Sequence, residues 1–286
     1  MRGRVCLVTG ASSGLGRATA RALARLGADL ILVSRDGPRA AEATCAVEQD
    51  ATGRVELLPD DFSSMDDVKR LAAEVRRRYR RLDVLINNAG VLRIERSLTA
   101  DGFETTFAVN HLAHFLLTNL LLDLLETSAP SRIVNVSSSA HYRGAIDFDD
   151  PSLAGGYSPM RAYSQSKLAN VLFTKELARR MGTPALTANA VHPGLVRTGF
   201  GRDNRGIKGT LARVFMAAQS PFMIGPEAGA DTIVYLAASP AVEGISGEYF
   251  VKRAVVEPSE LALDADAAAR LWEMSARLTG VADHRP

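Results

Sequence analysis

Two side chains that could exchange a proton with a substrate lie four residues apart in this sequence. Tyr163 and Lys167 open a strongly helical stretch, and this spacing places both side chains on one face of a helix. An isolated tyrosine has a pKa of about 10 and is neutral near pH 7, but a neighbouring ammonium group favours the phenolate and lowers that pKa. We therefore expect Tyr163 to be a general acid and base at working pH, although a tyrosine and a lysine at this spacing also occur often by chance.

Polar side chains that could complete such a site follow other apolar runs. Ser137–Ser139 and Asn87–Gly90 each stand at the end of one run. Ligands of open α/β sheets bind at the carboxyl ends of the strands, so one serine hydroxyl there could hold a substrate oxygen, and Ala89 and Gly90 are small enough for a cofactor to pass close. Asn110 comes early in the next helical stretch, where it could distort the helix and hold a water. Taken singly, each asparagine also fits a turn or a cap.

A glycine-rich turn suggests that the second reactant is a dinucleotide. Residues 9–16 read TGASSGLG between an apolar run and a helical pattern. Glycines let the backbone approach a pyrophosphate, and the N-terminus of the following helix offers free N–H groups. The spacing differs from the common GxGxxG, and the turn is weak support by itself, but it follows the first strand expected in an alternating chain. The residues expected to line the phosphates are Gly10, Ser12, Ser13, Gly14, Leu15 and Gly16.

The end of the second predicted strand indicates which dinucleotide binds. An acid there would bind the 2′-hydroxyl of the adenosine ribose, whereas a cation would accommodate a 2′-phosphate. The strand ends at Ser34 and Arg35 follows, and a guanidinium group forms charge-assisted hydrogen bonds with phosphate. We therefore expect NADP(H), with NAD(H) as the alternative because Asp36 is the next residue. Asp61, with Phe62 beside it, is placed to accept a hydrogen bond from the adenine amino group.

The elements that must position these residues alternate along the chain. Six short apolar runs predict strands and amphipathic stretches between them predict helices. The runs are almost continuously hydrophobic, which is typical of parallel strands buried on both faces, and the alternation predicts a doubly wound α/β fold. We expect a single Rossmann-type domain over residues 1–286 with helices on both faces of the sheet. The predicted strands are Val5–Thr9, Leu30–Ser34, Val55–Leu58, Val84–Asn87, Ile133–Ser137 and Thr187–His192.

Some helix boundaries can also be placed. Gly27 follows the helical stretch Arg17–Leu26, where a C-cap favours a residue that tolerates positive φ. Ser64, followed by acidic residues in the first turn, predicts the start of a helix. The arginine-rich run 76–81 is expected to be the solvated C-terminal end of that helix, where cations interact favourably with the helix dipole.

Composition excludes several classes of partner. The chain has 286 residues, of which 47% are hydrophobic, and its net charge of +2 is too small to predict nucleic acid as a partner. Cys6 and Cys45 lack the spacing of a metal site, and isolated thiols fit a reducing compartment. We find no export signal, and the apolar stretch Phe115–Leu125 is too short to span a bilayer. The sequence therefore predicts a cytoplasmic protein without a membrane anchor.

Taken in order, the motifs resemble those of the short-chain dehydrogenases/reductases of the Tyr-x-x-x-Lys type. TGASSGLG, NNAG, Asn110, VNVSS, YSQSK and a Pro-Gly element occur between Val5 and about Thr198. The resemblance implies that Tyr163 is the general acid and base, that Ser138 binds the carbonyl oxygen, that Lys167 binds the nicotinamide ribose, and that Asn110 anchors a water of a proton relay. Further residues that it places around NADP(H) are Asn88, Ala89, Gly90, Pro193, Gly194, Val196 and Thr198.

A finer resemblance is to the retinol dehydrogenase-like branch. It rests on the long segment His141–Arg161 and on the stretches AYSQSKLANVLFTKELARR and VHPGLVRTGF. Protochlorophyllide reductases are also similar, but they carry a cysteine where this chain has Ala162. The branch implies a carbonyl or alcohol substrate. Loops at this edge of a sheet usually shape the pocket, so we expect segments 141–161 and 199–226 to enclose a small to medium, largely apolar substrate, with Tyr157 and Phe200 among its walls.

Other interpretations remain open at this stage. The same fold supports biosynthetic enzymes without net redox chemistry, and proteins that only sense a dinucleotide. The long apolar stretches Leu112–Leu125 and Tyr163–Arg180 correspond to helices that often form a dimer interface in this family, which predicts a homodimer. The alternative is a monomer in which the segment His141–Arg161 covers them.

Overall fold

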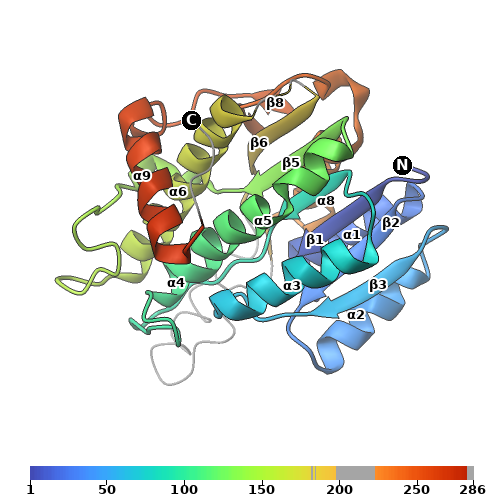
Figure 1. Cartoon of the computed structure of the whole chain (residues 1–286), viewed down its shortest axis with the longest axis horizontal. Coiled ribbons are helices and arrows are strands. Elements are labelled where there is room, and N and C mark those ends of the chain that lie inside the picture. Colours follow the sequence, from blue (N-terminus) through green and yellow to red (C-terminus); the bar gives the residue numbers. More distant parts are fainter. Residues whose placement is uncertain (182, 184, 198–222, 282–286) are drawn as a thin grey trace.

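The computed structural model describes residues 1–181, 183, 185–197 and 223–281. Its strands form one eight-stranded sheet in the order β3-β2-β1-β4-β5-β6-β7-β8 (Figure 1). All neighbouring strands are parallel except β7 and β8, and the order reverses between β1 and β4, as in a doubly wound fold. The strands are β1 Val5–Thr9, β2 Asp29–Ser34, β3 Val55–Pro59, β4 Val84–Asn87, β5 Ser131–Val136, β6 Leu186–His192, β7 Tyr249–Val251 and β8 Ala254–Val255.

The predicted fold class is confirmed, and each of the six predicted strands is present with its ends within two residues of the predicted ones. Two strands were missed. β7 and β8 have three and two residues, which is too short for a hydrophobic period to be visible. Cys6 is buried in β1 and Cys45 is exposed on α2, and neither forms a disulfide.

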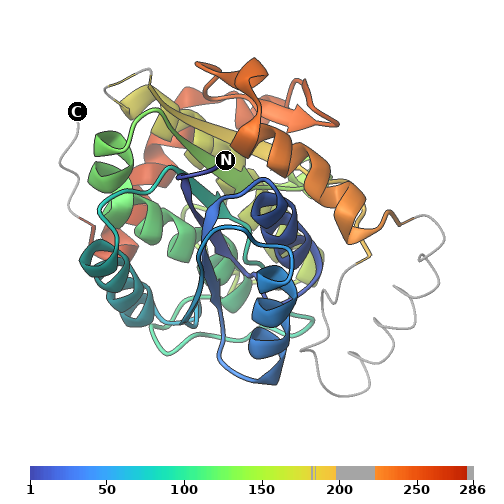
Figure 2. The same cartoon turned by 90° about the vertical axis from the view of Figure 1, so that its right-hand side faces the viewer.

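Helices cover both faces of the sheet (Figures 1 and 2). Side chains alternate along each strand, so in β1 Leu7 packs into the core under α3, α5, α6 and α9, whereas Cys6 and Val8 pack into the core under α1 and α8. One layer contains α1 Gly14–Arg25, α2 Pro38–Glu48 and α8 Pro226–Ala238; the other contains α3 Met65–Arg78, α5 Ala113–Thr127, α6 Pro159–Arg180 and α9 Ala265–Thr279.

The predicted helix boundaries follow from local chemistry. Ser64 precedes α3, and its hydroxyl accepts a hydrogen bond from the backbone N–H of Asp67, which satisfies one of the free donors of the first turn. Gly27 has a φ of +83°, in the left-handed region where glycine is favoured. α3 ends at Arg78 with Arg76, Arg77 and Arg78 exposed, so the prediction for the run 76–81 holds for its first three residues, whereas Tyr79 follows the helix and is buried.

One expectation about the apolar helix before β5 is wrong. The short helix α4 Thr105–Phe107, the π-helical turn η1 Ala108–Leu112 and α5 follow one another directly. The resulting helix Thr105–Thr127 has 23 residues and is long and apolar enough to cross a membrane by length and composition, whereas the sequence suggested a shorter stretch. In this fold 78% of its apolar window is buried, because the helix lies between the sheet and its neighbouring helices.

The C-terminal helix covers the face that the sequence suggested for a dimer. Trp272 of α9 packs edge-on against Phe115 of α5, with ring centroids 4.9 Å apart, and lies 5.9 Å from the ring of Phe173 in α6. The guanidinium of Arg180 lies over the same indole. The cover over α5 and α6 therefore includes α9, in addition to the segment His141–Arg161 that the sequence suggested.

Candidate active site

The predicted site residues come together at one edge of the sheet. The glycine turn follows β1, the NNAG turn follows β4, Ser137–Ser139 follow β5 and the Pro-Gly element follows β6. These strands are parallel, so their carboxyl ends lie at the same edge, beside the point where the strand order reverses. This is the place where open α/β sheets bind ligands.

Ser138 and Tyr163 are hydrogen-bonded to each other through their side chains. Ser138 precedes the short 3-10 helix η2 Ser139–Arg143, and its hydroxyl also accepts from the backbone N–H of Ala140 at 3.2 Å. Tyr163 lies in the first turns of α6, after the N-cap residue Ser158. The two elements thus hold a phenol and a serine hydroxyl side by side, which is the arrangement that the sequence predicted.

The pKa of Tyr163 is raised in the structure, whereas the sequence predicted that Lys167 would lower it. Burial raises its pKa to about 12, and the hydrogen bond with Ser138 offsets this only in part. Lys167 lies with its Nζ 5.6 Å from the centroid of the tyrosine ring, but desolvation of the phenolate outweighs the effect of the ammonium group. The correct spacing therefore does not by itself lower the pKa of Tyr163.

Lys167 is a buried cation held by the end of β5. It is 4% exposed, and its Nζ donates to the backbone oxygen of Val136 at 3.0 Å. One turn further along α6, the Nδ2 of Asn170 donates to the same oxygen at 3.1 Å. Burial lowers the pKa of Lys167 to about 8, because removal from water disfavours the charged form.

Asn110 lies in the π-helical turn η1 and is completely buried. Its Oδ1 accepts from the backbone N–H of Val91 at 2.7 Å, while its Nδ2 donates to the Val91 oxygen and to the Ser166 hydroxyl, both at 3.0 Å. A Cβ atom at Gly90 would lie 3.4 Å from the Oδ1 of Asn110 and 3.8 Å from the Nζ of Lys167. The predicted helix distortion is present, and it brings NNAG, Asn110 and Lys167 together.

The glycines of the first turn are required by its own packing. Gly10 and Gly14 have positive φ values of +69° and +51°. A Cβ atom at Gly16 would lie 2.2 Å from the backbone oxygen of Gly10, so α1 could not start this close to the turn. Asn88 fixes the turn from the other side, because its Nδ2 donates to the backbone oxygen of Thr9 at 2.7 Å.

The start of α1 fits the phosphates of a dinucleotide. Ser13 is its N-cap residue but makes no side-chain hydrogen bond to the first turn, so no capping side chain of the described chain competes with an anion there. Ser12 and Leu15 lie between the glycines, and Leu15 also packs toward α8, since a Cβ atom at Gly229 would lie 3.2 Å from its Cδ1.

The end of β2 fits the adenosine half of the cofactor. Ser34 is buried, and its Oγ has no hydrogen-bond partner within the described residues, so the site offers a polar atom that a ribose or phosphate group could satisfy. Arg35 beside it is exposed. Asp36 accepts from the N–H of its own neighbour Gly37, so this acid is occupied in the local turn.

The residues after β3 are arranged differently from the expectation. The Oδ1 of Asp61 accepts from the N–H and the hydroxyl of Ser63, at 2.9 and 2.8 Å, so one carboxylate oxygen shapes the turn toward α3. The ring of Phe62 is buried in the core, 5.3 Å from the imidazole of His114. Contact of these two residues with the adenine stays a prediction.

The element after β6 is described only in part. Gly194 has a φ of +92°, and Val196 forms an isolated parallel bridge with Ile224. Pro193 precedes this bridge at the same edge of the sheet. Thr198 and Phe200 lie outside the described residues, as does the segment 199–226 apart from residues 223–226.

The segment 141–161 is fastened to the loop that follows NNAG. The hydroxyl of Tyr157 donates to the backbone oxygen of Arg93 at 2.7 Å, and the Nε of Arg96 donates to the backbone oxygen of Ser152 at 2.9 Å. Burial raises the pKa of Tyr157 to about 12. The hydroxyl of Tyr157 is thus engaged with the backbone, and its contact with a substrate stays a prediction.

Three histidines near the site were not predicted from the sequence. Their signal is spacing: His141 comes three residues after Ser138, His114 comes four residues after Asn110, and His192 precedes the Pro-Gly element. His141 donates from Nδ1 to the backbone oxygen of Ser138 at 2.8 Å, because its Nε2 accepts from the backbone N–H of Ser259. The Nδ1 of His192 accepts from the N–H after Ser138. The pKa values of His141 and His192 are lowered mainly by burial.

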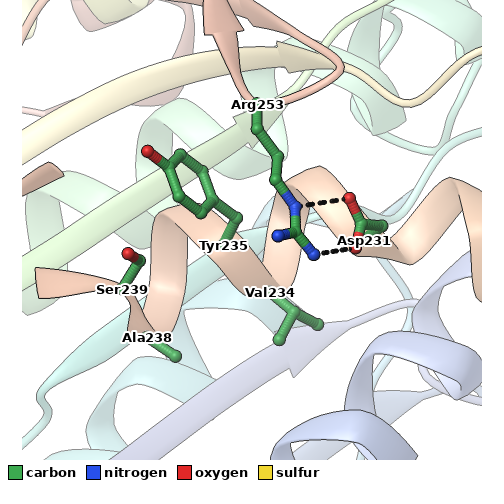
Figure 3. Close-up of a pocket in the computed structure, with 6 residues that line it drawn as sticks. All are labelled: Asp231, Val234, Tyr235, Ala238, Ser239 and Arg253. Atoms are coloured by element: carbon green, nitrogen blue, oxygen red, sulfur yellow. Dashed lines mark hydrogen bonds and ion pairs between the residues drawn. The ribbon is translucent and has the colours of Figure 1, made fainter. Parts of the chain in front are cut away.

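Figure 3 shows a cavity lined by none of the residues described so far in this site. It has a volume of about 300 Å³ and is lined by residues of α8, by its C-cap residue Ser239 and by Arg253 of the turn between β7 and β8. Arg253 is paired there with Asp231 and lies over the ring of Tyr235. None of the predicted site residues lines it, so this cavity is not the catalytic site.

Comparison with known proteins gives consistent matches. The family model of the short chain dehydrogenases matches residues 4–206. Human retinol dehydrogenase 14 is 45% identical over 98% of this chain and 88% of its own length. A protein assigned as a daunorubicin C-13 ketoreductase of Streptomyces sp. (strain C5) is 42% identical over 97% of this chain and 93% of its own. The crystal structure of an uncharacterised protein of Mycobacterium paratuberculosis is 37% identical with a TM-score of 0.77, over 98% and 94% of the two chains.

Proposed function

Because this chain belongs to the short-chain dehydrogenase family of oxidoreductases, in the retinol dehydrogenase-like branch, we propose that it transfers a hydride between NADP(H) and a carbonyl or alcohol carbon. The observation that carries the proposal is the hydrogen-bonded pair of Ser138 and Tyr163 beside the buried cation of Lys167. A phenol, a hydroxyl and an ammonium group at the ligand-binding edge of the sheet are the groups that carbonyl reduction requires.

Each side chain has a distinct part in this chemistry. The bound nicotinamide supplies or accepts the hydride. Ser138 holds the substrate oxygen, and Tyr163 donates its proton as negative charge develops there. A pKa of about 12 keeps Tyr163 protonated at neutral pH, so the phenol is in the form that can donate a proton to the substrate oxygen. Lys167 supplies positive charge behind the phenol, and Asn110 fixes the π-helical turn beside it.

The cofactor would lie along the carboxyl edge of the sheet. The turn from Gly10 to Gly16 and the N-terminus of α1 would hold the pyrophosphate. Ser34 and Arg35 would bind the 2′-phosphate of NADP(H), and this preference over NAD(H) rests on the cation that follows β2. Asn88, Ala89 and Gly90 would border the adenosine-side ribose and the path toward the nicotinamide, and Lys167 would bind the nicotinamide ribose.

The proposed substrate is a small to medium, largely apolar carbonyl compound or alcohol. The names of the relatives, retinol dehydrogenases and a daunorubicin C-13 ketoreductase, support an alcohol or carbonyl substrate. We propose that it binds over the nicotinamide, against the segments 141–161 and 199–226, within a single domain. Free thiols in Cys6 and Cys45 support a cytoplasmic location.

Replacement of Tyr163 by phenylalanine tests the proposal. Tyr163→Phe removes the proton donor and keeps the ring, so single-turnover hydride transfer to a panel of ketones and aldehydes should fall at least about 10²-fold, with little change in NADPH affinity. Transfer is followed by absorbance of the reduced nicotinamide. Tyr235→Phe, at the separate cavity on α8, is the matched control and should leave transfer unchanged.

Two results would count against this function. Near wild-type transfer by Tyr163→Phe would remove the tyrosine from the mechanism. Absence of any hydride transfer by the wild type, together with retained NADPH binding, would favour a non-redox enzyme or a dinucleotide sensor on the same fold.

A further inference from the structure

His114 joins two parts of the site that are far apart in the sequence. It lies at the start of α5 and is 2% exposed. Its Nε2 lies 3.0 Å from the Oγ1 of Thr9, and its Nδ1 lies 3.1 Å from the backbone oxygen of Asn110. Both ring nitrogens are therefore satisfied, one by the end of β1 and the other by the π-helical turn.

The partners determine where the proton of the imidazole lies. The backbone oxygen of Asn110 can only accept, so Nδ1 must carry the hydrogen. The Oγ1 of Thr9 already accepts from the backbone N–H groups of Asn88 and Ala89, at 2.8 and 2.9 Å. Its single hydrogen is then donated to the Nε2 of His114, since the other acceptor within reach, the backbone oxygen of Ile86, is more distant at 3.3 Å.

The imidazole stays in this neutral form at working pH. Burial lowers the pKa of His114 to about 3, and the nearby charge of Lys167 lowers it further. The ring of Phe62 packs against the imidazole at 5.3 Å. A ring that is buried, neutral and bonded at both ends has one orientation, so it transmits the position of one partner to the other.

Each end of this link holds one half of the reaction site. Thr9 fixes the turn at Asn88 and Ala89, which borders the cofactor path, through two backbone bonds. Asn110 ties the loop after NNAG to α6, the helix of Tyr163 and Lys167, through Ser166. The imidazole thus connects the cofactor turn to the helix that carries the acid and base.

We propose that His114 is a positioning residue that sets the cofactor turn in register with the π-helical turn of Asn110, and so aligns the two reactants for hydride transfer. The inference rests on the proposed function, because it assumes that the turn borders NADP(H). His114 touches neither reactant and acts only through Thr9 and Asn110. Loss of the hydrogen bond with Thr9 should therefore impair cofactor binding, whereas loss of the hydrogen bond with Asn110 should impair hydride transfer.

Two amide variants separate the two ends. His114→Asn keeps a donor near the position of Nδ1 but cannot reach Thr9, so the dissociation constant for NADPH should rise about fivefold to tenfold, by the loss of one hydrogen bond. His114→Gln can still accept from Thr9 but loses the donor to Asn110. It should keep NADPH affinity and lower single-turnover hydride transfer by a similar factor.

A matched control identifies a merely structural loss. His111 is also fully buried, lies one turn earlier on the same helix, and bonds to Ser275 of α9 at 2.8 Å. His111→Asn should lower the unfolding temperature but leave NADPH affinity and hydride transfer per folded molecule unchanged. If both His114 variants behave like His111→Asn, the proposal is overturned.

Hydrogen exchange separates this proposal from the proposed function. The amides of Asn88 and Ala89 are bonded to Thr9, so their protection should fall in His114→Asn and be retained in His114→Gln, whether or not the enzyme is active. Protection that is equal in both variants and in the wild type would refute the link even if the wild type reduces carbonyls. If protection falls in His114→Asn while the wild type transfers no hydride, the link is supported and the proposed function is refuted.

Discussion

Lys167 should reduce the stability of the folded protein at neutral pH. The side chain is 4% exposed and burial lowers its pKa from 10.5 to about 8. This difference corresponds to about 3 kcal/mol. Between these two pH values the unfolded chain still holds the proton that the folded chain has released, so the free energy of unfolding rises with pH across this range. Below pH 8 the folded protein carries the buried charge and lacks this stabilisation.

A comparison of variants isolates this effect from other titrating groups. The free energy of unfolding is measured by urea denaturation for wild type and Lys167→Met from pH 7 to pH 10.5. Over this range the wild type should gain about 3 kcal/mol relative to the methionine variant, whatever constant difference the methionine introduces. Lys167→Arg stays charged throughout and should not show this gain. Lys69→Met, on α3 at a side chain that is 51% exposed, is the control for removing a surface lysine.

A constant difference between wild type and Lys167→Met across this pH range would refute the reasoning, because the ammonium group would then be as well solvated in the folded as in the unfolded protein. If the gain is present, carbonyl reduction by the wild type should also decline as pH rises through about 8, since the cation behind Tyr163 is then lost. The charge that destabilises the fold is thus the one that the proposed reaction uses.

Three further results are expected. Wild-type kcat/KM should be higher with NADPH than with NADH, and equal values would contradict the proposed cofactor preference. The double variant Ser34→Asp, Arg35→Ile should lower kcat/KM for NADPH about tenfold or more, through loss of charged hydrogen bonds. His141→Leu removes the donor to the backbone oxygen of Ser138 and should slow hydride transfer without changing NADPH affinity; an unchanged transfer rate would exclude this role. The free energy of unfolding of this variant should also fall less than that of the wild type below about pH 6.5, because burial lowers the pKa of the neutral imidazole that it removes. Light scattering should give a mass near 30.6 kDa, because α9 covers the apolar faces of α5 and α6; twice that mass would show another interface.

The fold was predictable because its central strands are buried on both faces. β1 and β4 were predicted to the residue, since Val5–Thr9 and Val84–Asn87 are short apolar runs, each followed by a glycine- or asparagine-containing turn. β7 and β8 were missed because a strand of two or three residues takes its conformation from its neighbours and not from its own pattern. No helix was predicted over Ala265–Thr279, and nothing local showed that Trp272 would cover Phe115.

The site was predictable as a set of residues but not in its electrostatics. Tyr163 and Lys167 were correctly placed on one helix, because their spacing determines this. Spacing carries no information about solvent, however, and burial proved to be the dominant influence on both pKa values. His114 was missed for a related reason: its role depends on the Oγ1 of Thr9, which is 105 residues away in the sequence.

The structure also explains why the site forms at this edge of the sheet. Where parallel strands end, the ladder of backbone hydrogen bonds stops, and buried backbone oxygens need donors from elsewhere. Side chains supply these donors, and the hydrogen bond that each one makes also fixes its position. The contacts of this kind are Lys167 and Asn170 with the oxygen of Val136, Asn88 with that of Thr9, and His141 with that of Ser138. Positions fixed by backbone atoms do not depend on the identity of the strand residue, so the strand sequences can vary while the site keeps its geometry.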